Sequence, residues 1–325
     1  MTLEIPADAP VARDGDVQKP EVVRILHISD THGLHREIED KFPLPEADIL
    51  LHTGDFTNGC LEDELKDFDD WLGDLSARYP HRIAVCGNHE VYKGPLPQEE
   101  LSDLITRRRT KNLIKNATVL DHETIEVLGL KIFGSNWCPW HTSALPGGEG
   151  DSLQGWRHEL RELWRASRPS ETLKDHRFDE IPEGPDILMT HGPADGILDA
   201  FEMARCPYGS SKELYAAIIR TRPRVHLHGH LHEQRGVWYR PDNSQAGPFE
   251  GGIEYQIGPD GKVHPTWGKP PEDYPCTLIS CNAMLCSPKV DEMVGQSRGR
   301  YIAGPGRLII AERSSKDASW QFRLG

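Results

Sequence analysis

The chain has 325 residues, of which 37% are hydrophobic and 27% charged, as in ordinary globular proteins and unlike disordered or membrane-embedded ones. No apolar run approaches the roughly 20 residues that a membrane-spanning helix needs. Residues 1–20 contain acids and prolines where a secretory signal would have basic and then apolar residues. We therefore expect a flexible N-terminal tail and a cytoplasmic protein with no membrane partner.

The formal net charge is −14, from 37 basic and 51 acidic residues. This field opposes polyanions, so the charge argues against a long nucleic-acid partner. A small phosphate ester is compatible with it, because bound cations reverse the local potential in a pocket. Nothing in the sequence indicates a homo-oligomer, although one is possible.

The seven cysteines lack the C-x-x-C spacing of a zinc site. Without an export signal, reduced thiols are the expected state. Cys276, Cys281 and Cys286 recur every five residues, and we interpret them as ordinary buried thiols.

Five short runs rich in Val, Ile and Leu each end in a cluster of polar residues. Runs of this length and composition predict buried β-strands. They are Val22–Ser29, Ala47–Thr53, His81–Cys86, Asp186–Thr190 and Arg224–His228.

Helical patterns lie between these runs. Leu61, Leu65, Phe68, Leu72 and Leu75 are spaced for one face of an amphipathic helix. A second helix is expected over 211–222, where the serine at 211 can cap its first turn. Strands that alternate with helices indicate a layered α/β core, in which ligands gather at the carboxyl ends of strands. Every polar cluster lies at such an end.

We expect one domain over residues 21–313, closed by a strand at Arg307–Glu312, with a C-terminal tail over 314–325. Three stretches have the character of insertions at its rim. They are 97–116 and 147–180, where helix is expected, and 241–275, whose Gly and Pro content predicts an irregular excursion.

Five motifs occupy the strand ends. They are Asp30-x-His32, Gly54-Asp55, Gly87-Asn88-His89-Glu90, His191-Gly192 and Gly229-His230-x-His232. Each alone is weak, since an aspartate after a strand is usually a turn former or helix cap. All five together, in this order and at strand ends, are rarely produced by chance.

The set resembles the signature of the calcineurin-like metallophosphoesterases, and the resemblance spans Val22–Glu312. The resemblance is strongest to the small subfamily of metallophosphoesterase-domain-containing phosphodiesterases. Segments that resemble those of this subfamily are His52–Thr57, Gly134–Trp140 and IPEGPDILMTHGP. Departures are the 241–275 insertion, the acidic N-terminus and His228, where an apolar residue is expected. The resemblance implies a layered α-β-β-α fold with two mixed β-sheets flanked by helices.

The resemblance also implies two divalent metal ions about 3.5–4 Å apart, which need a bridging ligand such as a carboxylate. By resemblance this bridge is Asp55. The remaining ligands would be Asp30, His32 and His232 for one metal and Asn88, His191 and His230 for the other. Mixed oxygen and nitrogen ligands without thiolate favour manganese, with iron or zinc as alternatives.

In such a site a hydroxide held between the metals attacks phosphorus. The resemblance gives His89 a catalytic role beside Asp55, as general acid or electrostatic stabiliser at the leaving oxygen. Substrate contacts are expected from Asn88, His89 and Trp137. Glu90 is expected to orient His89 or a ligand.

Other polar and aromatic residues near the motifs allow two interpretations. His52, His226 and His228 lie on strands, where they could support the ligands or contact them directly. Trp137 and Trp140 could form the floor of a substrate pocket or act as packing anchors.

The function expected is hydrolysis of a small phosphodiester such as a cyclic nucleotide. Alternatives are a phosphomonoesterase, a dimetal enzyme acting on a non-phosphate bond in biosynthesis, and a catalytically silent binding module. Gly295–Gly299 matches G-x-S-x-G, but a serine hydrolase needs a strand before this motif and a histidine after it. Both are missing from the sequence, so we reject that reading.

Overall fold

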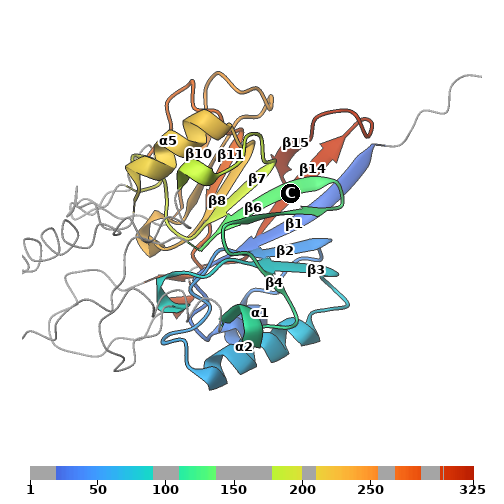
Figure 1. Cartoon of the computed structure of the whole chain (residues 1–325), viewed down its shortest axis with the longest axis vertical. Helices are drawn as coiled ribbons and strands as arrows, with labels where there is room; N and C mark the ends of the chain where they lie inside the picture. The colour runs from blue at the N-terminus through green and yellow to red at the C-terminus, as the bar shows by residue number, and fades with distance from the viewer. Residues whose placement is uncertain are drawn as a thin grey trace, which may run out of the picture.

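The computed structural model describes residues 20–90, 110–136, 178–199, 210–254, 268–286, 301–302 and 304–325. Two β-sheets face each other, and helices cover their outer faces (Figure 1). This is the layered α/β fold with two mixed sheets that the sequence predicts.

The first sheet has six strands in the order β15-β14-β1-β2-β3-β4. β1 to β4 are parallel, and β14 pairs antiparallel with both β1 and β15. The strands are β1 (Glu21–Ile28), β2 (Ile49–His52), β3 (His81–Ala84), β4 (Thr118–Val119), β14 (Arg307–Arg313) and β15 (Gln321–Leu324).

The second sheet has seven strands in the order β10-β9-β11-β8-β7-β6-β5. β6, β7, β8 and β11 run parallel. β5 pairs antiparallel with β6, and β9 pairs antiparallel with both β11 and β10. The strands are β5 (Glu123–Val127), β6 (Leu130–Ser135), β7 (Ile187–Thr190), β8 (Val225–His228), β9 (Gly236–Tyr239), β10 (Glu250–Ile253) and β11 (Leu278–Cys281), and a separate pair comprises β12 (Leu285–Cys286) and β13 (Tyr301–Ile302).

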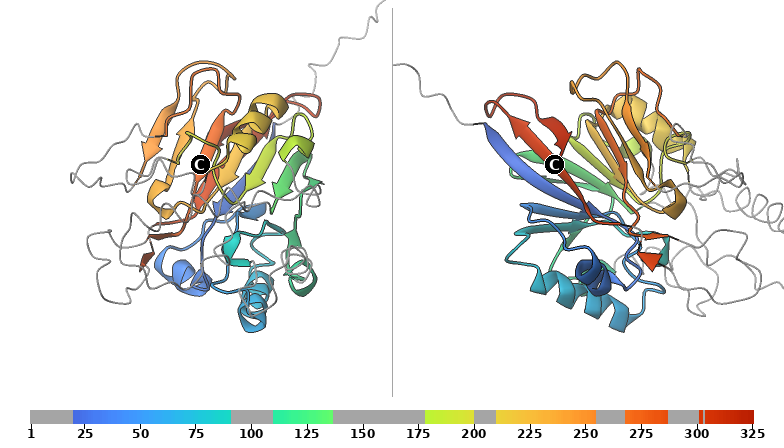
Figure 2. Two further views of the ribbon diagram at one scale, coloured as in Figure 1. Left: turned by 60° about the vertical axis from the view of Figure 1, so that its left-hand side comes forward. Right: turned by 180° about the vertical axis from the view of Figure 1, so that it is seen from behind.

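An apolar layer fills the space between the sheets. On β1, Ile25 faces this layer, whereas Leu26 packs on the outer side among helix residues. Ile187 and Val225 of the second sheet join the same inner layer. Because these central strands are covered on both faces, they appear in the sequence as continuous apolar runs. Figure 2 shows the two sheets from two further directions.

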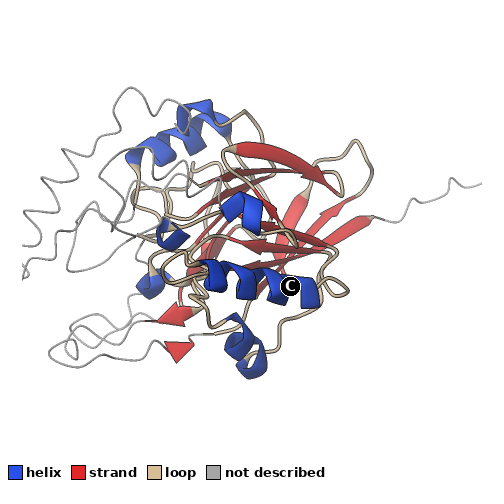
Figure 3. Ribbon diagram, turned by 60° about the horizontal axis from the view of Figure 1, so that its bottom comes forward, coloured by secondary structure: helices blue, strands red, loops and turns tan. Residues whose placement is uncertain are grey.

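Helices α1 (His35–Lys41) and α2 (Glu62–Asp74) cover the outer face of the first sheet (Figure 3). The predicted apolar face of α2 is confirmed at Leu65, Phe68 and Leu72, all of which are buried. Leu61 departs from it, because this residue precedes the first helical turn and is 51% exposed.

Helix α5 (Lys212–Thr221) covers the outer face of the second sheet. The Ser211 hydroxyl accepts a hydrogen bond from the Leu214 amide at 3.0 Å, which confirms the predicted cap. Three short 3₁₀ turns complete the described helices: η1 (Asn88–Glu90), η4 (Phe178–Glu180) and η5 (His232–Gln234). None of the helices in the described ranges has the length and hydropathy to cross a bilayer.

All five predicted strands are confirmed, as β1, β2, β3, β7 and β8, and so is the closing strand β14. The prediction of a C-terminal tail is wrong. Residues 321–324 form β15, which pairs with β14, and Phe322 is only 2% exposed. The prediction of an irregular excursion over 241–275 is wrong at Glu250–Ile253, because this segment is β10, paired with β9.

The helices expected over 97–116 and 147–180 can be compared with the structure only in part. Residues 110–113 are helical and 178–180 form η4, and most other residues of these two stretches lie outside the described residues. Residues 1–19 of the expected N-terminal tail also lie outside them. Cys276 and Cys281 are buried free thiols, as expected.

The C-terminal strand yields the first prediction. Replacing Phe322 by alanine should lower the free energy of unfolding by about 3–5 kcal/mol, because a buried aromatic ring would leave a cavity. Urea denaturation measures the change. The matched control is Arg323→Ala on the same strand, whose side chain is 56% exposed and whose loss should shift the value by less than about 0.5 kcal/mol. Equal effects of the two variants would mean that 321–324 is a tail after all.

Candidate metal centre

The five motif loops meet at one end of the two sheets, where β1, β2, β3, β7 and β8 finish. Backbone hydrogen bonds join neighbouring loops, as from the Asp30 amide to the Gly54 carbonyl at 2.9 Å. Side chains join the two sheets. The His191 ring nitrogen Nδ1 lies 2.8 Å from the Thr53 carbonyl oxygen, and the His230 amide donates to the Asp30 carboxylate at 3.0 Å. The loops therefore form one connected polar cluster.

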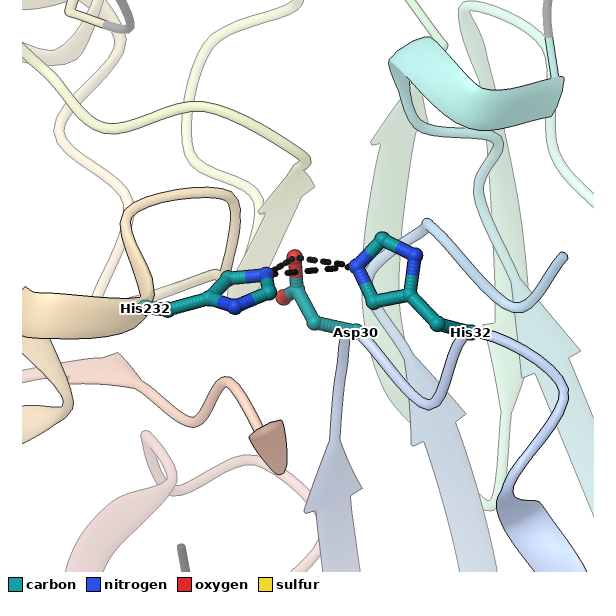
Figure 4. Close-up of side chains that lie close together, drawn as sticks. All are labelled: Asp30, His32 and His232. Carbon is teal, nitrogen blue, oxygen red and sulfur yellow. Dashed lines mark hydrogen bonds and ion pairs between the residues drawn. The ribbon is translucent and has the colours of Figure 1, made fainter. Parts of the chain in front are cut away.

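One group within this cluster contains Asp30, His32 and His232 (Figure 4). The Asp30 carboxylate lies between the two rings, with Oδ1 at 3.2 Å from Nε2 of His232 and 4.0 Å from Nε2 of His32. The two Nε2 atoms are 3.2 Å apart. Three potential ligand atoms thus converge within coordination reach of a single ion.

A second group contains Asp55, His191 and His230, and a third combines Asp55 with His32 and His89. Oδ2 of Asp55 lies 3.2 Å from Nε2 of His191, and that nitrogen lies 3.0 Å from Oδ1 of Asn88. The same Asp55 oxygen is 3.8 Å from Nε2 of His32, which belongs to the first group. Asp55 therefore stands between the two groups, and the clusters are consistent with a site for two metals.

Burial and charge prepare these side chains for cations. Burial lowers the pKa of His32 and of His230 to about 3, so both rings are neutral and each can offer a lone pair. Burial alone would raise the pKa of Asp55, but His191 holds it well below its usual range. Burial alone would lower the pKa of His191, but the nearby negative charge of Asp55 outweighs this effect and raises the pKa to about 10. His191 therefore holds a proton beside Asp55, which a bound cation would displace.

The backbone of the site is strained. Asp30, His32, Asp55 and His230 all have left-handed backbone angles, with φ of 55°, 44°, 55° and 68°. Each such residue costs about 1–3 kcal/mol and persists only where its surroundings over-determine it. Strain gathered on four residues of one polar cluster indicates that the loops are shaped for function.

Two glycines of the motifs are required by close packing. A Cβ atom on Gly87 would collide with Oδ1 of Asp55, and one on Gly229 would collide with the Asp30 carboxylate. The loops can approach the two carboxylates this closely only with glycine at these positions.

Glu90 joins two of the loops from beneath. Its fully buried carboxylate accepts hydrogen bonds from the amides of Asp55 and Gly87, both at 2.8 Å, and from the Thr57 amide at 2.9 Å. The Thr57 hydroxyl donates to it as well, at 2.8 Å. The sequence suggested that Glu90 orients His89 or a ligand, and the structure shows it holding the backbone of Asp55.

His89 lies at the edge of the cluster with its side chain 17% exposed. Its Nδ1 lies 2.7 Å from the carbonyl oxygen of Asn58, so Nδ1 carries the proton and donates it to this bond. Nε2 lies 3.9 Å from Oδ2 of Asp55. Sequence reasoning missed Asn58, whose side chain also donates to the His32 carbonyl at 2.8 Å. Its contact with His89 uses the backbone, which leaves no side-chain signature.

The strand histidines lie below the cluster and outside its ligand groups. His52 accepts the Gly54 amide at 3.2 Å, and its other nitrogen lies 3.1 Å from the Thr31 hydroxyl. His226 lies 2.9 Å from the Thr190 hydroxyl. These contacts favour the supporting role over direct contact with a metal for His52 and His226.

His228 is fully buried, and its clearest contact is a long one, 3.4 Å from Nδ1 to the Gly229 carbonyl. The sequence analysis did not identify another buried strand histidine, His27, because it lies within an apolar run. Its two ring nitrogens lie 3.0 Å from the hydroxyls of Ser280 and Thr53, so it joins the two sheets beneath the cluster. Trp137, Trp140 and the 295–299 motif lie outside the described residues.

Comparisons with known proteins agree with this geometry. Residues 23–234, more than half of the chain, match the family profile described as calcineurin-like phosphoesterase. The chain is 32% identical over 253 residues to human metallophosphoesterase domain-containing protein 1, covering 73% of this chain and 67% of the human one. It is also 32% identical over 225 residues to a UPF0046 protein of Caenorhabditis elegans, covering 66% and 70% of the two chains.

Among solved structures, the fold is similar to that of phosphopantetheinyl hydrolase from Mycobacterium tuberculosis. The TM-score is 0.39 and the sequence identity 18%, with 66% of this chain and 85% of that chain covered. A purple acid phosphatase from yellow lupin seeds gives a TM-score of 0.38 at 11% identity, covering 94% of this chain and 52% of that one.

The Glu90 contacts yield the second prediction. Glu90→Gln should weaken metal binding about 10- to 100-fold, as expected when a group that orients the ligands is altered. The glutamine amide would face backbone N–H groups that now donate to a carboxylate. Isothermal titration with Mn²⁺ measures the affinity. Glu37→Gln, an exposed change on α1, is the matched control. Unaltered affinity in Glu90→Gln would show that the loops hold their shape without this carboxylate.

Proposed function

The chain belongs to the calcineurin-like phosphoesterase family, and we propose that it is a dimetal-dependent hydrolase whose substrate is a small phosphodiester, such as a cyclic nucleotide. The observation that carries the dimetal proposal is the position of Asp55. This single carboxylate lies within 4 Å of nitrogens from both ligand groups. A shared carboxylate is what a pair of neighbouring metal ions requires.

In this proposal, Asp30, His32 and His232 would hold one ion. Asn88, His191 and His230 would hold the other, and Asp55 would be shared by the two. The donor set fits, because ionised carboxylates and neutral imidazoles bind Mn, Fe or Zn, and of these we propose manganese. His191 would release its proton when the ion binds. When bound, two such ions lower the pKa of a water and neutralise charge on the phosphate.

The charge balance of the ligands supports binding of an anion. Asp30 and Asp55 are the acidic members of the two groups, and Asn88 is neutral. Two divalent ions would therefore retain net positive charge for the phosphate oxygens. His89 is proposed to contact the leaving oxygen through Nε2, because its Nδ1 is engaged by the Asn58 carbonyl. Asn88 is proposed to contact the substrate as well, and so is Trp137.

The preference for a small ester over a macromolecule rests on charge, and the preference for a diester rests on the resemblance of the sequence to the phosphodiesterase subfamily. A chain with a formal charge of −14 disfavours docking to acidic macromolecules, and this leaves small esters as the favoured class. The second candidate is a phosphomonoesterase. A dianionic monoester would gain more than a monoanionic diester from the positive charge that the ligand set leaves.

Two substitutions separate the proposed roles. Asp55→Ala should lose both ions, because one carboxylate serves both groups. His89→Ala should keep both ions and lose about 10²–10⁴-fold in kcat, the usual contribution of acid–base catalysis. Elemental analysis and steady-state kinetics measure the two effects. Asp70→Ala and His81→Ala are matched controls, since Asp70 is exposed on α2 and His81 begins β3 at the far end of the strand. Loss of metal from His89→Ala would refute its assigned role.

The substrate class needs a separate comparison. With Mn²⁺ present, kcat/KM should be higher for bis-p-nitrophenyl phosphate and for 2′,3′- or 3′,5′-cyclic nucleotides than for p-nitrophenyl phosphate or a phosphopeptide. The phosphopeptide should be the poorer substrate because an acidic surface repels acidic macromolecules. The preference over p-nitrophenyl phosphate follows from the resemblance of the sequence to the phosphodiesterase subfamily. A preference of about tenfold or more for the monoester, equivalent to about 1.4 kcal/mol in transition-state binding, would replace the diester proposal by the monoesterase. The dimetal proposal would stand in either case.

A further inference from the structure

A second hollow lies at the opposite end of the second sheet from the metal centre. Its volume is about 410 Å³, and it opens beside the residues that lead into β7 and β8. The metal ligands follow the other ends of the same two strands. Six side chains matter for its chemistry: Asp186, Arg222, Arg224, Arg313, Asp317 and Gln245.

Two of its arginines have no carboxylate partner. Among the described residues, no acidic oxygen lies within 4.0 Å of the guanidinium of Arg222 or Arg224. Arg222 donates one hydrogen bond, to Oε1 of Gln245 at 3.2 Å. Arg224 donates one long bond, to the Asn243 carbonyl at 3.5 Å, and its buried Nε has no acceptor.

Most other arginines of the described residues differ in this respect. Arg36, Arg78, Arg235, Arg307, Arg313 and Arg323 each form an ion pair. Arg220 and Arg240 lack a carboxylate but each donate to three backbone carbonyls. Since a guanidinium offers five N–H donors, Arg222 and Arg224 retain most of theirs for a ligand.

The backbone presents both guanidiniums from one short rigid segment. Arg222 ends α5 with left-handed angles, φ 53° and ψ 52°, which favour glycine at this position. Pro223 follows, is buried and restricts the chain before Arg224.

The acidic residues of the hollow do not cancel these donors. The Asp186 carboxylate accepts the Lys131 amide at 2.9 Å, and its charge interacts with Arg224 without a contact within 4.0 Å. Arg313 is paired with Glu21. Three arginines and two aspartates line the hollow, so the formal charge of its lining is small on a chain whose formal charge is −14. Recognition here would come from hydrogen-bond geometry rather than from long-range attraction.

We propose that this hollow is a second binding site, which holds the phosphate group of a small molecule between Arg222 and Arg224. Each planar guanidinium can donate two parallel hydrogen bonds to a pair of phosphate oxygens, which is why arginine predominates in such sites. A volume of about 410 Å³ lies within the range of small-molecule pockets, roughly 300–1,000 Å³, and leaves room beyond a phosphate. The site is independent of the metal centre and of the function proposed for it.

The test is a titration of inorganic phosphate into the Mn²⁺-loaded full-length chain, followed by calorimetry. Phosphate will also reach the metal centre, so the number of sites is the decisive quantity. The wild type should bind one phosphate more than the double variant Arg222→Gln/Arg224→Gln. Each single variant, and Arg224→Lys, should weaken the additional site at least about tenfold, as expected for loss of a charge-assisted bond.

Controls separate this site from general charge effects. Arg36→Gln removes an equally charged arginine that is paired with Asp67 and Asp74 on another face, and it should leave both sites intact. Inhibition of turnover by phosphate should be the same in the wild type and the double variant, because neither arginine belongs to the metal centre. Equal numbers of sites and equal affinities in these two proteins would overturn the proposal. An equal loss in Arg36→Gln would overturn it as well.

A parallel titration with phenylphosphonate distinguishes the source of the phosphate group. Tighter binding of this ester-like anion at the additional site identifies a phosphorylated small molecule as the ligand. Tighter binding of inorganic phosphate identifies the free ion. Failure of both anions to bind outside the metal centre would contradict the assignment.

Discussion

Two carboxylates, Asp30 and Asp55, are buried where the ends of the two sheets meet, and a charge withdrawn from water must be compensated nearby. The compensation comes from the loops themselves. The His230 amide donates to Asp30 and the His89 amide to Asp55, while His232 and His191 each place a ring nitrogen 3.2 Å from one of the two carboxylates. The placement of the loops, their glycines and their backbone strain all follow from enclosing these two charges.

The rest of the fold keeps this arrangement rigid. Central strands that are covered on both faces cannot slide without disrupting close packing on both sides. Hydrogen bonds beneath the loops add to this rigidity. Glu90 connects the loops that follow β2 and β3, and His27 connects the two sheets. Strained backbone at four residues persists because these surroundings determine it from several sides. The proposed function depends on a scaffold that keeps the strained loops in place at one end of the two sheets.

The sequence predicted the parts whose signals are local. Apolar runs identified the central strands, and polar residues at their ends identified the site, because parallel strands bring their carboxyl ends to one edge. Features that depend on contacts between residues far apart in the sequence were not predicted. The strand at 321–324 presents a single buried residue, Phe322, and is identified only by its pairing with β14. Asn58 contacts His89 through a backbone carbonyl, which its side-chain type does not reveal. Arg222 lines the hollow only because of where α5 ends in the folded chain.

The central claim is that Asp55 joins two metal ions held by the two ligand groups. Crystals of the chain grown with Mn²⁺ and measured near the manganese absorption edge test it directly through anomalous scattering. Two peaks are expected, one beside Asp30, His32 and His232 and the other beside His191 and His230, separated by roughly 3.5–4 Å, with Asp55 contacting both. A single peak, or two peaks of which Asp55 contacts only one, would contradict it.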